Sequence, residues 1–369
     1  MFTRTLQFIC LVLTTVGTCV IAANAQNSPE AKKVLLLFTH ESHQPAQIIL
    51  EDALRSTLTK ESATPLEIYS DYLDGSRTRV DSYEPYLVEL VRRKYEDKKF
   101  DLIIPVNTPA LSLLLKNRSE LFPGTPIVFL LLEKRNLDDL NLGTNVTGLW
   151  AESNYKANLD LALELHPGTQ SVVVISGVGP WDNYFRAAVQ QDFRPYEGKL
   201  QFNYLNGLSI PELQQTLSTL PEGTVVSFIS SSQDRLGNTS GNLEVLRQIC
   251  PVSNSPVYGA TDAQLGLGIV GGRLTSFEDL GVKGAELGLR ILAGEKPESI
   301  PPHGVEGVAM FEWRGLQRWN ISEQNLPRGS KIRFKELSFW ELYKWRIIGV
   351  TGVLLLQTLL IAILLIERN

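Results

Sequence analysis

Two periodicities of apolar residues alternate along the middle of this chain. Short runs rich in Val, Ile and Leu, such as those at 34–39, 102–106 and 127–132, are typical of strands that are buried on both faces. The longer segments between them carry apolar residues three and four positions apart, as amphipathic helices do. This alternation predicts an α/β fold in which crossover helices cover parallel sheets.

The alternation comes in two sets, which predict two doubly wound lobes. The first lobe is expected over residues 26–148, with strands at 34–39, 66–72, 102–106 and 127–132. The second lobe is expected over 149–260, with strands at 171–176, 200–204, 225–229 and 257–258. A return crossing is expected near 260–310, where the glycine-rich segment 266–272 precedes a helix at 280–292. Two such lobes predict a ligand cleft between them.

The apolar pattern changes near the C-terminus. Residues 347–366 carry no charge and are long enough to cross a bilayer, so we expect a transmembrane helix there, with a buried core helix as the alternative. Residues 311–346 are then a juxtamembrane segment, and residues 367–369 are a cytoplasmic stub. Trp340, Tyr343 and Trp345 suit the headgroup region.

The N-terminus predicts export. Arg4, an apolar run over 6–23 and the sequence Ala23-Asn24-Ala25 are typical of a signal peptide over residues 1–25, with an uncleaved signal anchor as the alternative. The main domain then lies outside the cytoplasm. The basic residues Lys344 and Arg346 on the expected outer side oppose the positive-inside tendency, and we let the N-terminal signal set the orientation.

Composition narrows the function. Hydrophobic residues make up 43% of the chain, enough for two cores, and Cys250 is the only cysteine beyond the expected signal, so no disulfide is expected. A net charge of −5 without a long basic run argues against nucleic acid as a partner. The sequence HESH at 40–43 lacks zincin spacing, and there is no G-x-S-x-G elbow. We therefore expect no catalytic residues, no metal and no cofactor.

Candidate ligand contacts follow from the predicted topology. Ligands of open α/β sheets bind beyond the carboxyl ends of the strands, where short polar side chains and an aromatic ring could hold a small polar molecule. The candidates at these positions are Thr39, Ser42, Asn107, Thr108, Glu133, Trp181, Ser231 and Asp262. For several of them a purely structural role stays open, since Ser42 and Thr108 could cap helices and Trp181 could belong to the core.

Several short motifs carry a family resemblance. The sequences TPIVF at 125–129, NVTG at 145–148, PVY at 256–258 and ILAGEKP at 291–297 resemble the ABC-transporter substrate-binding-like family of type 1 periplasmic binding proteins over about residues 33–310. The tail, with FEWRGLQRW at 311–319, LPRGS at 326–330 and WELYKW at 340–345, is similar to the segment that joins this domain to the membrane in bacterial sensor histidine kinases. Such kinases continue beyond the point where this sequence stops.

The resemblance implies a membrane-tethered sensor domain of a two-component-type signalling protein that lacks its own kinase module. It would lie outside the bacterial inner membrane, cross it once after signal cleavage, bind a small molecule and transmit lobe closure to a second copy or to a histidine kinase partner. The alternative from a different class is a membrane-anchored substrate-binding component of an ABC transporter. A truncated kinase relic is a third possibility, and the ligand and the oligomeric state are left open.

Overall fold

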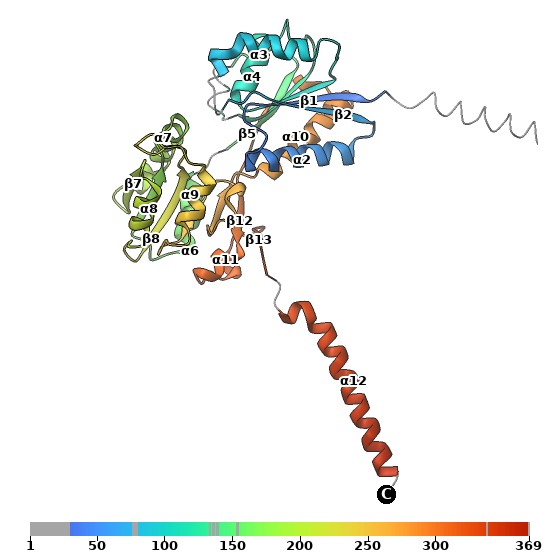
Figure 1. Cartoon of the computed structure of the whole chain (residues 1–369), viewed down its shortest axis with the longest axis vertical. Coiled ribbons are helices and arrows are strands. Elements are labelled where there is room, and N and C mark those ends of the chain that lie inside the picture. The colour runs from blue at the N-terminus through green and yellow to red at the C-terminus, as the bar shows by residue number, and fades with distance from the viewer. Residues whose placement is uncertain are drawn as a thin grey trace, which may run out of the picture. The chain divides into compact units, whose positions relative to one another are not determined.

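The computed structural model describes residues 30–75, 80–132, 134, 137, 140–152, 155–336 and 339–367. The predicted signal peptide therefore lies outside the described residues. The chain divides into two compact units (Figure 1). Of the described residues, the first unit contains those up to 152 together with Thr261–Ala263 and Leu274–Val308, and the second contains Tyr155–Ala260, Gln264–Arg273 and those from 309 onward.

The first unit is built on a six-stranded sheet in the order β11-β5-β4-β3-β1-β2, with parallel pairing between neighbours. Its strands are β1 (Lys32–Phe38), β2 (Leu66–Tyr72), β3 (Leu102–Val106), β4 (Ile127–Leu132), β5 (Val146–Ala151) and β11 (His303–Val305). Its helices are α2 (Pro45–Glu61), α3 (Val80–Lys94), α4 (Thr108–Lys116) and α10 (Phe277–Leu292).

Alternate side chains of the buried strands form two cores, one on each face of this sheet. Val34 and Leu36 of β1 pack with α2 and α10, whereas Leu35 and Leu37 pack with α3 and α4. Figure 1 shows the two helix pairs on opposite sides of the sheet. Because both faces are covered, the strands are continuous apolar runs, which is why the sequence pattern located them.

Helices α2 and α10 are in unusually close contact. A Cβ atom at Gly281 of α10 would lie 2.6 Å from the Ala53 Cβ and 2.7 Å from the Leu50 carbonyl oxygen of α2, so this position requires glycine. Farther along, the corresponding atom at Gly288 would be 3.8 Å from Leu58. The two helices therefore run in the same direction, and their N-termini lie at the same edge of the sheet.

The second unit contains a seven-stranded sheet in the order β13-β12-β10-β9-β8-β6-β7. Its strands are β6 (Ser171–Ser176), β7 (Gln201–Asn206), β8 (Thr224–Ser230), β9 (Val257–Tyr258), β10 (Gly271–Leu274), β12 (Val308–Glu312) and β13 (Lys331–Arg333). Its helices are α6 (Tyr155–Leu165), α7 (Pro180–Phe193), α8 (Ile210–Leu217), α9 (Asn242–Ile249) and α11 (Trp313–Arg318). Tyr155 and Leu159 of α6 pack with Val189 and Phe193 of α7 over the sheet.

Two expected boundaries differ from the structure. The second lobe was expected from 149, but β5 runs through that position and pairs with β4, so residues 149–151 belong to the first sheet. The expected juxtamembrane segment over 311–346 instead contributes the end of β12, then α11 and β13, to the second unit. Phe311 and Leu316 are fully buried there, because they extend the core of that unit.

The glycine-rich segment 266–272 was expected to be a crossing between lobes, but it lies in the second unit and leads into β10. Two of its backbone amides donate hydrogen bonds to a carboxylate side chain of the same chain. The buried Glu312 carboxylate accepts hydrogen bonds from the Gly266 and Gly268 amides at 3.0 and 3.1 Å. Both glycines have positive φ angles, 89° and 97°, which turn the amides toward the carboxylate.

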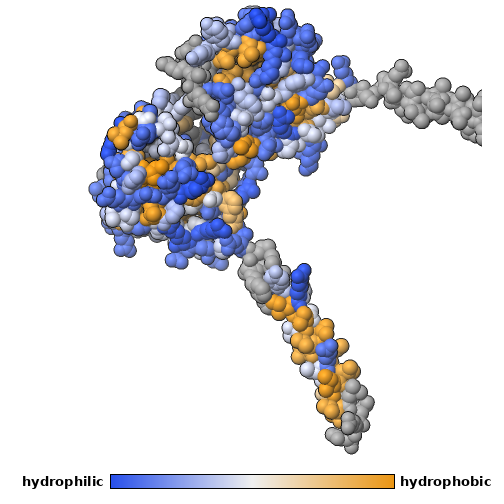
Figure 2. All heavy atoms as spheres, viewed as in Figure 1, coloured by the Kyte–Doolittle hydropathy of each residue, from blue (hydrophilic) through white to orange (hydrophobic). Residues whose placement is uncertain are grey.

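Helix α12 (Phe339–Glu367) differs from every other helix in its surface. Its segment Tyr343–Ile363 is long and apolar enough to cross a membrane, and none of it is buried. Figure 2 shows apolar residues along most of the coloured part of this helix, interrupted by a few polar ones. The predicted fold class, two α/β lobes with parallel sheets and a C-terminal apolar helix, is confirmed.

Candidate functional site

Both units share one strand order. Read by position along the chain, β2-β1-β3-β4-β5 and β7-β6-β8-β9-β10 have the same 2-1-3-4-5 arrangement. In such a sheet the order reverses between the first and third strands, and ligands bind beyond the carboxyl ends of the strands at that point. The switch points are therefore β1/β3 in the first unit and β6/β8 in the second.

Thr39 holds the first switch point together. It directly follows β1, is 2% exposed, and its hydroxyl donates a hydrogen bond to the Val106 carbonyl of β3 at 2.9 Å. The same oxygen accepts a hydrogen bond from the Ala110 amide of α4 at 3.2 Å. Because both hydrogen bonds are made within the protein, the Thr39 side chain fixes the positions of β1, β3 and α4 relative to one another.

Asn107 holds a strained backbone at the same switch point. It follows β3 with φ 71° and ψ 159°, a region that residues other than glycine rarely adopt. Its amide donates to the Leu130 carbonyl at 2.9 Å, and its side chain makes no capping bond to α4. Thr108 is the first residue of α4. Asp74 after β2 and Leu131 in β4 also have positive φ angles, so strain gathers along this edge.

Asp262 adds a half-buried carboxylate at the N-terminus of α10. Its Oδ2 accepts hydrogen bonds from the Ser276 hydroxyl at 3.0 Å and from the Glu278 amide at 3.3 Å. Its Oδ1 is buried and has no hydrogen-bond partner among the described residues. Burial raises the pKa of this carboxyl, although hydrogen bonds from the start of α10 act in the opposite direction.

A second buried polar atom lies on the helix beside α10. Gln47 is in the first turn of α2, is 6% exposed, and its Nε2 donor has no partner within the described part of the chain. Since α2 and α10 run in the same direction, Gln47 and Asp262 belong to the same N-terminal end of the helix pair. A buried donor and a buried acceptor without partners are costly unless a further group binds them.

The β1–α2 loop contains both buried and exposed polar residues. Glu41 is 5% exposed and accepts a hydrogen bond from the Gln44 side chain at 2.8 Å. Burial lowers the pKa of His40, and the charge of Glu41 offsets this only in part. Ser42 is exposed and does not cap α2, whose N-cap residue is Gln44. Glu133 lies outside the described residues.

A buried carboxylate organises the second switch point. Asp182 of α7 is 0% exposed and accepts hydrogen bonds from the loop that follows β6 and from the loop that follows β8. From the β8 side, the Ser230 hydroxyl donates at 2.6 Å and the Ser232 hydroxyl at 2.7 Å. The amides of Gly179, Ser232 and Gln233 complete the set at 3.0, 3.1 and 3.3 Å. All of these donors are satisfied by one side chain.

Sequence reasoning did not select Asp182, although a signal was present. It is the third residue of a helix that begins with proline after Gly179, a position where an acidic residue closes a capping box.

The two candidates expected near the second switch point differ in their exposure and contacts. Trp181 is 50% exposed and stacks on Phe185 with ring centroids 6.2 Å apart, while Ser231 is buried and its amide donates to the Asn242 side chain at 2.5 Å.

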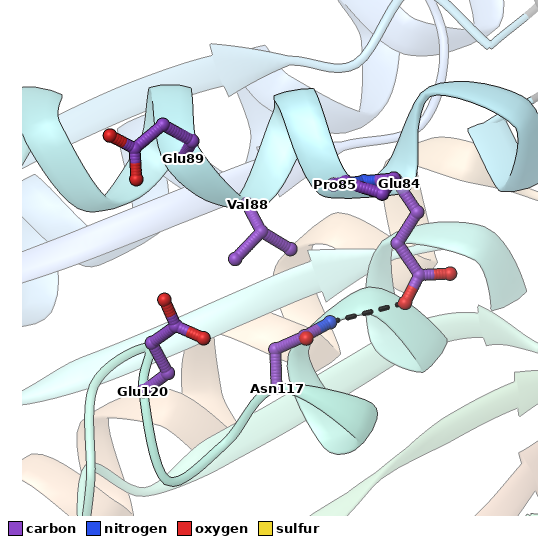
Figure 3. Close-up of a pocket in the computed structure, with 6 residues that line it drawn as sticks. All are labelled: Glu84, Pro85, Val88, Glu89, Asn117 and Glu120. Atoms are coloured by element: carbon purple, nitrogen blue, oxygen red, sulfur yellow. Dashed lines mark hydrogen bonds between the residues drawn. The ribbon is translucent and has the colours of Figure 1, made fainter.

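A surface pocket of about 440 Å³ lies elsewhere, between α3 and the C-terminal end of α4 (Figure 3). Glu84 there pairs with Lys116 at 3.0 Å and accepts a hydrogen bond from Asn117 at 3.2 Å. Asn117 caps the end of α4 opposite to Asn107, so this pocket is remote from the first switch point. Its lining residues are Glu84, Pro85, Val88, Glu89, Asn117 and Glu120.

Comparison with protein families gives a match over most of the chain. Residues 82–312 match the family model described as ABC transporter substrate binding protein. No curated protein gives a significant sequence match.

Solved structures of similar fold include three that this chain matches over their entire length. The ligand-free, open structure of a substrate binding protein with adhesive properties from Clostridium difficile has a TM-score of 0.61 and 16% identity, covering 83% of this chain and 100% of that one. The ABC domain in complex with L-Trp from Streptococcus pneumonia has a TM-score of 0.56 and 18% identity, with 82% and 100% covered. A conserved domain protein from Vibrio cholerae has a TM-score of 0.55 and 18% identity, covering 82% of this chain and 100% of that one. These identities are low, so the likeness establishes the fold.

Proposed function

Because the chain belongs to the family of ABC transporter substrate binding proteins, we propose that it binds a small polar molecule outside the cytoplasm, at the carboxyl edges of its sheets. Membership in this family and the matching fold support a binding protein for a small ligand. The proposal goes further in two respects, namely the chemistry of the ligand and the biological role of binding.

The observation that carries the proposal is the unpartnered Oδ1 atom of Asp262. A carboxylate oxygen that is buried without a donor is destabilising, and a ligand ammonium or hydroxyl group would supply the missing bond. The strained Asn107 at the same edge fits a residue held for binding rather than for stability. We assign Thr39 a positioning role, and the proposed contacts are Ser42, Asn107, Thr108, Glu133, Trp181, Ser231 and Asp262.

We further propose that α12 anchors this domain in the bacterial inner membrane as a single span. The apolar segment Tyr343–Ile363 supports the anchor, and the family supports an extracytoplasmic domain. The leading role is that of a membrane-anchored substrate-binding component that delivers its ligand to an ABC permease.

A sensor role is the second candidate, and α12 is the observation that favours it. A continuous helix of 29 residues that leads from the binding domain into a bilayer could carry a change in population across the membrane. Co-purification after cross-linking in cells distinguishes the roles, since recovery of permease and ATPase subunits supports delivery and recovery of a histidine kinase supports signalling.

The binding proposal is tested by thermal shift on residues 30–336, screened against amino acids including L-tryptophan, purines, sugars and small organic acids. A ligand at a hundred times its Kd stabilises the native state by about 2.7 kcal/mol. The Asp262→Asn variant should weaken binding of the best hit at least about tenfold, while Gln191→Ala, an exposed change on α7, should not. If every compound class is silent, or Asp262→Asn binds as well as the parent, the proposed site is wrong.

A further inference from the structure

Helix α12 contains one amide side chain at the middle of its apolar run. Residues 347–366 are uncharged, and Gln357 lies eleven residues after Arg346 and ten before Glu367. At about 1.5 Å per residue, each flanking charge is about 15 Å away along the helix axis. In the single membrane span proposed above, Gln357 is therefore at the centre of the hydrocarbon layer, where water is absent.

Gln357 differs in its hydrogen bonding from its neighbour Thr358. The Thr358 hydroxyl donates to the Leu354 and Leu355 carbonyls at 3.0 and 2.8 Å, which removes its need for an outside partner. Gln357 is exposed, and its amide offers two N–H donors and a carbonyl acceptor. Lipid tails provide neither donors nor acceptors, so this group favours a protein partner.

The residues on the same face as Gln357 have the spacing needed to pack against a second apolar helix. Val350, Val353, Gln357 and Leu360 follow a three-four spacing, the heptad pattern of a two-helix seam. Val350, Val353 and Leu360 are 61%, 57% and 58% exposed, so this face has no cover within the described residues. The two Thr residues, Thr351 and Thr358, each follow a seam residue by one position and so lie outside the seam.

We propose that two copies of this chain pair through the seam Val350–Val353–Gln357–Leu360, with the two Gln357 amides hydrogen-bonded to each other. A second copy is the occupant that the chemistry favours, because an amide is both donor and acceptor and so is complementary to itself across a two-fold axis. Copies inserted in the same orientation are parallel, which brings residue 357 of one helix opposite residue 357 of the other. A single polar side chain in such a seam also fixes its register.

The test uses the full chain in lipid vesicles and rests on the proposed membrane anchor. Two preparations carrying donor and acceptor fluorescent proteins after residue 369 are mixed, and energy transfer is followed as the protein-to-lipid ratio changes. We expect Gln357→Leu to weaken association about five- to thirtyfold, Gln357→Asn to retain most of it, and Thr358→Val to leave it unchanged.

A second pair of variants tests the seam without changing polarity. Leu360→Phe should weaken association because it crowds the seam, whereas Leu359→Phe, on a different face of the helix, should not. Equal association of the parent and Gln357→Leu, or equal loss in Thr358→Val, overturns the pairing. A chain that stays monomeric in vesicles yet still binds its ligand overturns the pairing alone, whereas a chain that pairs but binds nothing overturns the proposed function alone.

Discussion

The two units share a strand order, but each has an aspartate near the carboxyl edge of its sheet, and the two carboxylates are used in opposite ways. In the second unit, Asp182 accepts hydrogen bonds from donors in both loops of the β6/β8 switch point, and no capacity is left over. In the first unit, Asp262 has donors on one oxygen only, and its other oxygen is buried without a partner. The same topology thus supports one edge that is internally complete and one edge that is not.

The difference teaches where to look for a ligand in a repeated fold. Topology marks the carboxyl edges of both sheets equally well, so topology alone cannot rank them. The hydrogen bonds of the two carboxylates can rank them. A carboxylate whose oxygens both accept internal hydrogen bonds holds loops together, whereas one with an unpartnered oxygen can still accept a hydrogen bond from a ligand. This comparison predicts that Asp182 acts mainly on stability and Asp262 mainly on binding.

The largest expected effect is that of Asp182→Ala. It leaves donors from the buried residues Gly179 and Ser230 and from the half-buried Ser232 and Gln233 without an acceptor, and should cost about 3–5 kcal/mol of unfolding free energy. Urea unfolding of residues 30–336 measures this, with Gln191→Ala on the same helix expected to change stability by less than about 0.5 kcal/mol. A cost near that of the control would mean that Asp182 does not hold the switch point together.

A smaller loss is expected for Thr39→Val, which tests the side chain that holds the first switch point together. The change removes one hydrogen bond donated to Val106 and one accepted from Ala110, and should cost about 1–2 kcal/mol. Thr39→Ser keeps the hydroxyl and should recover most of the loss. If Thr39→Val destabilises the protein as much as Asp182→Ala, the two switch points do not differ in the way described above.

The raised pKa of Asp262 makes a prediction about pH. Because its folded-state pKa lies above the usual carboxyl value, the folded protein binds the proton more tightly than the unfolded chain. Its contribution to stability is therefore fully present below the usual value and is lost as pH rises through the raised value. Relative to Asp262→Asn, the parent should lose stability over that window and then stay level. Unfolding measured between about pH 3 and 8 checks this, and a parallel pH dependence of the two proteins contradicts it.

The fold could be predicted from the sequence wherever burial was complete. Strands such as β3 and β6 are continuous apolar runs, and the helices between them have one apolar face, so pattern and structure agree. The pattern failed in two places. Only three residues form β13, which is too few for a periodicity to be seen, and the chain enters β5 directly from a loop, so the boundary at 149 fell inside a strand.

The candidate site could be located from the sequence but not resolved into roles. Every candidate chosen after a strand rested on topology, which does not say what each side chain contacts. Thr39 and Thr108 look equivalent as sequence, yet the Thr39 hydroxyl bridges β3 and α4. The role of Asp182 depends on Ser230 and Ser232, about fifty residues away in sequence, and no local pattern contains that information.

The smallest expected effect, and the sharpest test of the comparison, is that of Asn107→Gly. Glycine adopts the backbone angles of this position without strain, so the change should stabilise the first unit by about 1 kcal/mol. Asn145→Gly is the matched control, since Asn145 also has a positive φ angle, 64°, but its side chain donates to the Gly124 carbonyl at 2.8 Å and would lose that bond. If Asn107 is strained for the sake of binding, Asn107→Gly should raise stability and weaken binding of the best screening hit, whereas Asn145→Gly should leave binding unchanged. A stabilised Asn107→Gly protein that binds as tightly as the parent would separate the strain from the site, and the support for that edge would then rest on the unpartnered atoms of Asp262 and Gln47.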